Sequence, residues 1–120
     1  MTDHLNYMKR AITIGMQGRW TSPPNPWVGC IITNHGMIVG EGYHHKAGEP
    51  HAERHALKQA GAAASGSTVY TTLEPCAHHG RTSPCVNALI ETGVETVYVA
   101  LEDPDSRVKG KGILQLREAG

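Results

Sequence analysis

Glu74-Pro-Cys-Ala-His-His-Gly-Arg-Thr-Ser-Pro-Cys85 is the most informative stretch of this sequence, and His51-Ala-Glu53 lies upstream of it. One imidazole and two thiolates are ligands that suit zinc, and three protein ligands leave the fourth tetrahedral position for water. Bound zinc lowers the pKa of such a water from about 15.7 toward 7. Glu53 is not needed as a ligand, so its carboxylate is free to move protons. The two motifs therefore predict a catalytic zinc site with His51, Cys76 and Cys85 as ligands and Glu53 as the catalytic residue.

The predicted zinc ligands lie close to helix signals in the sequence. His51 begins a predicted helix over residues 51–60, and Cys85 begins another over residues 85–92. Pro75 precedes Cys76, and proline is favoured at the first position of a helix. Because helix N-termini favour negative charge, they help to keep both thiols deprotonated.

A noncatalytic interpretation of the same residues stays open at this point. A purely structural zinc site would need a fourth protein ligand. Four side chains could supply it, namely Cys30, His55, His78 or His79. In that case the chain would be a zinc-stabilised binding or assembly module. Cys30 lies within a predicted strand, which favours a position in the core.

The rest of the chain predicts alternating helices and strands. Helical spacing predicts a first helix over residues 3–18, and a hairpin follows with strands over 28–33 and 37–41. Residues 68–72 form a predicted strand, 94–101 a predicted buried strand, and about 112–119 a last helix. Helices interleaved with the later strands imply parallel crossovers beside the antiparallel hairpin. We therefore expect an α/β fold with three α/β/α layers, its mixed sheet of about four to five strands having helices on both faces.

Composition narrows the class of protein. The chain has 120 residues, which fits one domain, and its 11 basic and 11 acidic residues give a formal net charge of zero. Nucleic-acid binders usually carry a basic excess, so we expect no nucleic-acid partner. No apolar run approaches the roughly 20 residues that span a bilayer, and the first residues lack a signal-peptide pattern. We expect a cytoplasmic protein without a membrane partner, and the odd count of three cysteines argues against a disulfide framework and for metal binding or catalysis.

Five motifs, in the same order, resemble the deaminase domain of the bifunctional riboflavin-biosynthesis deaminase/reductase. Its zinc loop, E-P-C-x-H-x-G-[RK]-T-P-P-C, is similar to residues 74–85, which are longer than the P-C-x-x-C of simple nucleoside deaminases. The other matching segments are Asn25-Pro-Trp-Val-Gly-Cys30, Gly42-Tyr-His44, Gly48-Glu-Pro-His-Ala-Glu53, and Asp103-Pro-Asp105 with Gly110-Lys-Gly112.

The resemblance implies a cytidine-deaminase-like fold and a specific reaction. That reaction is hydrolytic deamination of 2,5-diamino-6-ribosylamino-4(3H)-pyrimidinone 5′-phosphate at the ring 2-amino group. By position, His51, Cys76 and Cys85 would bind zinc and Glu53 would shuttle protons. The residues that the resemblance assigns to the substrate are Asn25, His44, His78, Arg81 and Asp103. Deaminases of this fold usually associate, so a homo-oligomer is expected.

Two departures from the family pattern bear on the substrate. Ser83 stands where a proline is usual, and Asp105 replaces a common asparagine. The alternative is therefore a deaminase of another small nucleobase, nucleoside or modified pyrimidine, although Arg81 suits a phosphate. Residues 1–120 contain no glycine-rich dinucleotide fingerprint, which predicts a deaminase domain without the reductase. A reductase domain or protein outside this chain is a possible partner.

Overall fold

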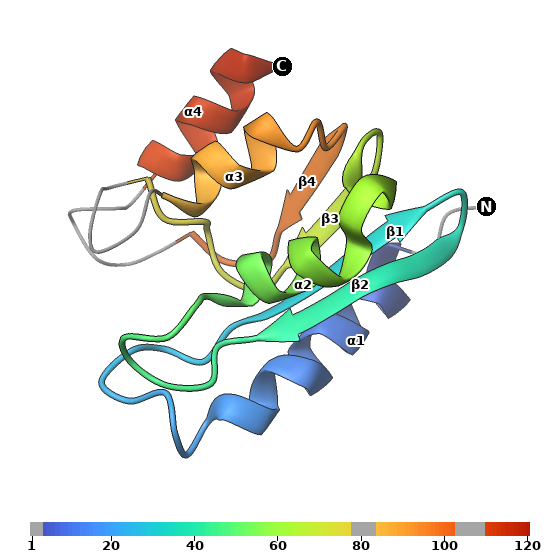
Figure 1. Ribbon diagram of the computed structural model, residues 1–120. Helices are drawn as coiled ribbons and strands as arrows, with labels where there is room; N and C mark the ends of the chain where they lie inside the picture. The colour runs from blue at the N-terminus through green and yellow to red at the C-terminus, as the bar shows by residue number, and fades with distance from the viewer. Residues whose placement is uncertain (1–3, 78–83, 103–109) are drawn as a thin grey trace.

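The computed structural model describes residues 4–77, 84–102 and 110–120 of the chain (Figure 1). Helices and strands alternate in the order that the sequence predicts. In chain order they are α1 (His4–Gly15), β1 (Gly29–Asn34), β2 (Met37–Tyr43), α2 (Ala52–Ala60), β3 (Thr68–Thr71), α3 (Cys85–Glu91), β4 (Thr96–Val99) and α4 (Lys111–Ala119). Short 3₁₀ turns, Met16–Gly18 and Gly61–Ala64, extend α1 and α2.

The described strands form one mixed sheet in the order β2-β1-β3-β4. The predicted hairpin is confirmed, because β1 pairs with β2 in antiparallel register and a bulge between Ile32 and Thr33 shifts that register. β1 also runs antiparallel to β3. β3 and β4 are parallel, and α3 forms the crossover between them. This arrangement brings the residues that follow β3 to the same end of the sheet as the start of α2 (Figure 1).

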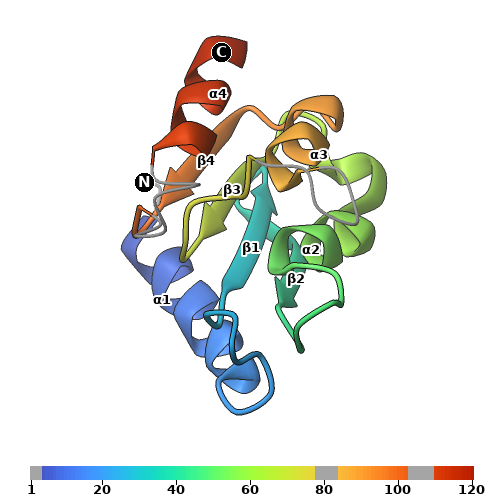
Figure 2. The same ribbon diagram turned by 90° about the vertical axis from the view of Figure 1, so that its left-hand side faces the viewer.

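Side chains alternate between the two faces of the sheet and build a core on each. On one face Cys30 and Ile32 of β1 pack with residues of α2 and α3, and on the other Ile31 packs with Ala11 and Ile14 of α1. Figure 2 shows α1 on one side of the sheet and α2 with α3 on the other. α4 packs beside α3. The predicted three-layer α/β/α architecture is confirmed.

The prediction of a buried strand over residues 94–101 is wrong in both length and burial. β4 spans four residues and borders only β3 within the described sheet. Tyr98 is 37% exposed and Leu101 is 59% exposed. Val94 and Val97 are only partly buried and pack against the edge of the core. Residues 94–99 also line a groove together with residues of α4.

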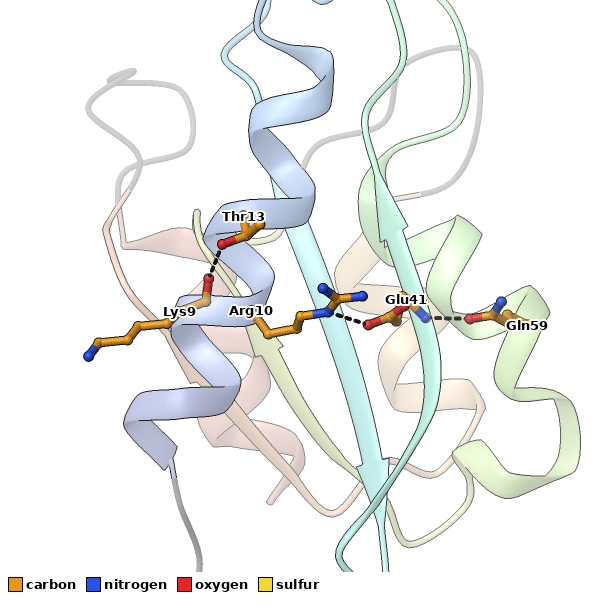
Figure 3. A network of polar contacts seen from close by, with 5 residues as sticks. All are labelled: Lys9, Arg10, Thr13, Glu41 and Gln59. Atoms are coloured by element: carbon orange, nitrogen blue, oxygen red, sulfur yellow. Dashed lines mark hydrogen bonds and ion pairs between the residues drawn. The ribbon is translucent and has the colours of Figure 1, made fainter.

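Polar contacts of Glu41 on β2 connect both helical layers (Figure 3). Arg10 Nε of α1 donates a hydrogen bond to Glu41 Oε2 over 3.0 Å. The backbone N–H of Glu41 donates to Gln59 Oε1 of α2 over 2.7 Å. The ion pair is exposed to solvent, so its contribution to stability is small. The two hydrogen bonds of Glu41 show that both α1 and α2 lie within hydrogen-bonding distance of β2.

Replacing Gly29 by alanine is expected to lower the free energy of unfolding by about 3 kcal/mol or more, because overpacking against backbone cannot be relieved by a rotamer change. A Cβ atom at Gly29 would lie 1.8 Å from Ala11 O and 2.7 Å from Gly15 N. Urea denaturation measures the loss. Gly36→Ala is the control, since that exposed turn site has open space and a φ of 77°, and we expect a cost of about 1–2 kcal/mol there. Equal losses in both variants would contradict the close packing of α1 on β1.

Across the parts of the chain that the structure describes, no helix has the length and apolar character that crossing a membrane requires.

Candidate active site

Three side chains from distant parts of the sequence converge at the ends of α2 and α3. His51 occupies the N-cap position of α2 in extended conformation, and Cys85 is the first residue of α3. Cys76 lies on the segment between β3 and α3. One potential ligand atom from each residue lies within 4.8 Å of those of the other two. The structure therefore brings together the imidazole and both thiols that the sequence predicts as metal ligands.

The spacing of these atoms fits a tetrahedral metal ion. With zinc–sulfur and zinc–nitrogen bonds of about 2.3 and 2.05 Å, tetrahedral geometry places nitrogen and sulfur about 3.6 Å apart. His51 Nδ1 lies 3.7 Å from Cys76 Sγ and 3.4 Å from Cys85 Sγ. The geometry also selects Nδ1 of His51 as the ligand atom, which the sequence leaves undecided. Three protein ligands at this spacing leave one tetrahedral position for a small molecule.

The electrostatic environment favours a thiolate at Cys76. Its pKa is lowered to about 4, chiefly because the thiol of Cys85 donates a hydrogen bond to it and His51 lies alongside. The backbone N–H of Cys85, at the start of α3, also donates to Cys76 Sγ over 3.2 Å. The same thiol–thiolate hydrogen bond and burial raise the pKa of Cys85. The pair thus carries one negative charge that attracts a cation.

Glu53 places a carboxyl group beside this cluster. It lies in the first turn of α2, two residues after His51, and is only 3% exposed. Burial raises its pKa to about 7, while the nearby His51 acts in the opposite direction. A carboxyl group with a pKa near neutrality can both accept and donate protons at physiological pH. Because burying a carboxyl group is costly, a carboxyl group with a raised pKa is typical of a functional site.

Two of the candidate fourth ligands are described, and neither belongs to the cluster. Cys30 is buried in β1 beneath the site, where burial raises the pKa of its thiol. His55 lies one turn further along α2, and its ring stacks on His45 at 4.4 Å between centroids. Neither is among the described residues whose ligand atoms converge with those of His51. His78 and His79 lie outside the described residues.

Asn25 and His44 form a hydrogen-bonded pair against the ring of His51. His44 is 2% exposed, and its ring meets that of His51 edge-on at 5.1 Å. His44 Nδ1 donates to Pro50 O over 3.2 Å, so Nε2 accepts from Asn25 Nδ2 over 3.1 Å. Burial lowers the pKa of His44, consistent with this neutral form. His44, one of the five residues that the resemblance assigns to the substrate, therefore lies next to the proposed metal ligand, and Asn25 is bonded to it.

The other predicted substrate residues, His78, Arg81 and Asp103, lie outside the described residues, as do Ser83 and Asp105.

Glu74 is the first residue of the motif over residues 74–85, and its role is visible only in the folded structure. Glu74 is 3% exposed, and its carboxylate accepts hydrogen bonds from the backbone N–H groups of Gly110 and Ile113 at α4. In the sequence, Glu74 is a charged residue between apolar neighbours, Leu73 and Pro75, and this was the one local sign of a buried carboxylate. Its partners lie 36 and 39 positions further along the chain, so the contact could not be identified from local pattern.

A family model for the cytidine and deoxycytidylate deaminase zinc-binding region matches residues 1–101 of the chain. The chain belongs to this family. The matched residues include all three converging ligands and Glu53. The deaminase resemblance inferred from the motifs is thus confirmed, and the tetrahedral spacing described above agrees with a zinc-binding region.

Within the family, the chain is similar to riboflavin-biosynthesis deaminases. It is 56% identical to riboflavin biosynthesis protein RibD of Escherichia coli K12 over 114 residues, covering 95% of this chain and 31% of that protein. It is 52% identical to the diaminohydroxyphosphoribosylamino-pyrimidine deaminase of Buchnera aphidicola subsp. Schizaphis graminum, covering 95% of this chain and 78% of that protein. The solved structure of Acinetobacter baumannii RibD, form 2, matches with a TM-score of 0.95 at 50% identity, covering 98% of this chain and 33% of that one. The chain thus spans about a third of the length of the RibD proteins.

Proposed function

We propose that this chain catalyses the zinc-dependent hydrolytic deamination of 2,5-diamino-6-ribosylamino-4(3H)-pyrimidinone 5′-phosphate in riboflavin biosynthesis. The observation that carries the proposal is a buried carboxyl group, Glu53, beside an imidazole and two thiols at tetrahedral spacing. The deaminase name of the Buchnera relative, which this chain matches over most of its length, supports the reaction class and the substrate. Residues 1–120 would form the zinc-dependent deaminase domain.

His51 Nδ1, Cys76 Sγ and Cys85 Sγ would hold the zinc ion. Zinc supplies Lewis-acid chemistry that makes hydroxide available at neutral pH. Both thiols must lose their protons to bind zinc, and the lowered pKa of Cys76 favours its thiolate form. The N-terminal ends of α2 and α3 point their backbone dipoles toward the thiolates and help to stabilise their charge.

Glu53 would move the protons of the reaction. It accepts a proton from the attacking water and donates it to the ring nitrogen, and it then accepts the proton of the added hydroxyl group and donates it to the departing amine. A carbon–oxygen bond forms and the carbon–nitrogen bond of the 2-amino group breaks, so that water is consumed and ammonia released without oxidation or reduction. The pKa near 7 suits this exchange, because the carboxyl group loses and regains its proton at little cost.

Asn25 and His44 would contact the substrate from the side of His51. The hydrogen bond to His44 uses one N–H of the Asn25 amide, which leaves Oδ1 and a second N–H for a pyrimidine edge. His78, Arg81 and Asp103 are proposed as further substrate residues, with Arg81 suited to the phosphate. The predictions of a homo-oligomer, of a reductase partner outside this chain and of a cytoplasmic location stay predictions.

The test is ammonia release by the zinc-loaded protein from the phosphorylated diaminopyrimidine, with its dephosphorylated form and cytidine as parallel substrates. We expect turnover of the phosphorylated compound alone. Turnover of cytidine or of the dephosphorylated compound at a comparable rate would favour a deaminase for another pyrimidine. Zinc-loaded protein that releases no ammonia from any of the three would favour a noncatalytic zinc module.

A further inference from the structure

Glu74 caps a helix that is distant in sequence from it. Its Oε1 accepts a hydrogen bond from Gly110 N over 2.9 Å, and its Oε2 accepts one from Ile113 N over 3.0 Å. Gly110 is the N-cap residue of α4 and Ile113 its third residue. Gly110 has no side chain to cap the helix, so a single buried carboxylate satisfies two N–H groups that the first turn leaves without helical partners. The negative charge also lies at the positive end of the helix dipole.

Contacts around Glu74 pack α4 closely against the segment that carries Cys76. The backbone N–H of Glu74 donates to Leu101 O over 2.9 Å. Gly112, in the first turn of α4, is buried, and a Cβ atom there would lie 2.2 Å from Pro75 O. The backbone of Pro75 is therefore in direct contact with the helix that Glu74 caps.

The same segment is anchored to α3 at its other end. Cys76 O accepts a hydrogen bond from Val86 N, and Cys76 Sγ accepts one from Cys85 N, each over 3.2 Å. Between the two anchors lies Pro75, whose ring restricts the φ angle. Little conformational freedom is left between the Glu74 carboxylate and the Cys76 thiolate. A shift of Glu74 must therefore move either Cys76 Sγ or the start of α4.

We propose that Glu74 is a positioning residue for the metal centre. By capping α4, its carboxylate fixes the Pro75–Cys76 backbone, and through it the distance between Cys76 Sγ and His51 Nδ1. The inference rests on the metal site of the proposed function and assigns that site a supporting contact from α4. Mutation of residues that support metal ligands without binding the metal typically lowers metal affinity 10- to 100-fold.

The experiment compares Glu74→Gln with the wild-type full chain. Glutamine keeps the shape of the side chain but replaces one acceptor oxygen by an NH₂ group, which cannot accept from an α4 N–H. Zinc affinity is measured by competition with a chelator, and the ligand geometry by the absorption spectrum of the cobalt(II)-substituted protein. We expect zinc affinity to fall at least about tenfold and the cobalt bands to shift. Glu118→Gln, an exposed change on the same helix, is the matched control and should leave both readouts unchanged.

Two outcomes separate this inference from the proposed function. If Glu74→Gln lowers the melting temperature but keeps wild-type zinc affinity and the wild-type cobalt spectrum, Glu74 is only a helix cap and the inference is wrong. If wild-type protein itself binds neither metal, the proposed function fails first and the inference with it. Should Glu74→Gln not fold, Glu74→Asp is measured in its place. It keeps the charge, but its shorter side chain cannot reach both N–H groups, so the same loss of affinity is expected.

Discussion

Glu53→Gln is expected to lower kcat about a thousandfold, within the range that general acid–base catalysis contributes, while the zinc content stays at one ion per chain. The amide has the size of the carboxyl group but cannot accept and return a proton. Glu53 is not one of the three converging ligands, so the metal should remain bound. Steady-state ammonia release and zinc analysis of the same sample measure both quantities. A variant that retains turnover would remove Glu53 from the mechanism.

Stability of the same variant provides the control for folding. In the folded protein the pKa of Glu53 is raised from 4.5 to about 7 by burial. The stability associated with its protonated form is present below about pH 4.5 and is lost as the pH rises through about 7. Glutamine cannot ionise, so chelator-treated Glu53→Gln should become more stable than wild type as the pH rises. Above pH 7 the difference should be on the order of 3 kcal/mol. Urea denaturation at pH 5 and pH 8 tests this.

Cys85→Ala is expected to weaken zinc binding several hundredfold. Zinc bound by four protein ligands is worth about 10–16 kcal/mol at neutral pH, so one ligand accounts for roughly 3–4 kcal/mol. Competition with a chelator measures the affinity directly, and activity at limiting zinc should fall in parallel. The thiol lies at the start of α3 and is not needed for the helix itself, since alanine is a good helix former.

Cys30→Ala is the matched control for the ligand assignment. Cys30 lies in the core beneath the site and outside the described group of converging ligands, so the variant should keep wild-type zinc affinity while losing some packing energy. Loss of zinc in Cys30→Ala would place that thiol at the metal and revive the structural, four-ligand alternative. Wild-type affinity in Cys85→Ala would contradict the site as described.

Burial of Glu53 lowers the stability of the folded protein when its carboxyl group is ionised. The carboxyl group gives up hydration, and its charged form is opposed by the thiolate of Cys76. A bound cation would relieve part of that repulsion, because it compensates the charge of both groups. The proposed catalysis would need the proton of Glu53 to be mobile near neutral pH, and a carboxyl group buried for this purpose lowers the stability of the fold.

Local sequence patterns are sufficient to predict the chemistry of the ligands and the order of helices and strands. Thiols, an imidazole and a carboxyl group can be identified from short motifs, and helix starts at His51 and Cys85 are visible because capping and periodicity are local properties. The hairpin with strands over residues 28–33 and 37–41 is likewise predicted from two short apolar runs, and β1 and β2 confirm it. Residues within a few positions of one another suffice for each of these inferences.

Which atoms come into contact follows from the three-dimensional packing of the chain. His51 presents Nδ1 to two thiols 25 and 34 positions away, and Glu74 binds the start of a helix 36 positions away. The exposure of β4 also depends on its place at the border of the described sheet rather than on its apolar composition. The physical reason is the same in each case. Distances of a few ångström between remote residues follow from how helices pack on the sheet, and packing is a property of the whole chain rather than of any segment.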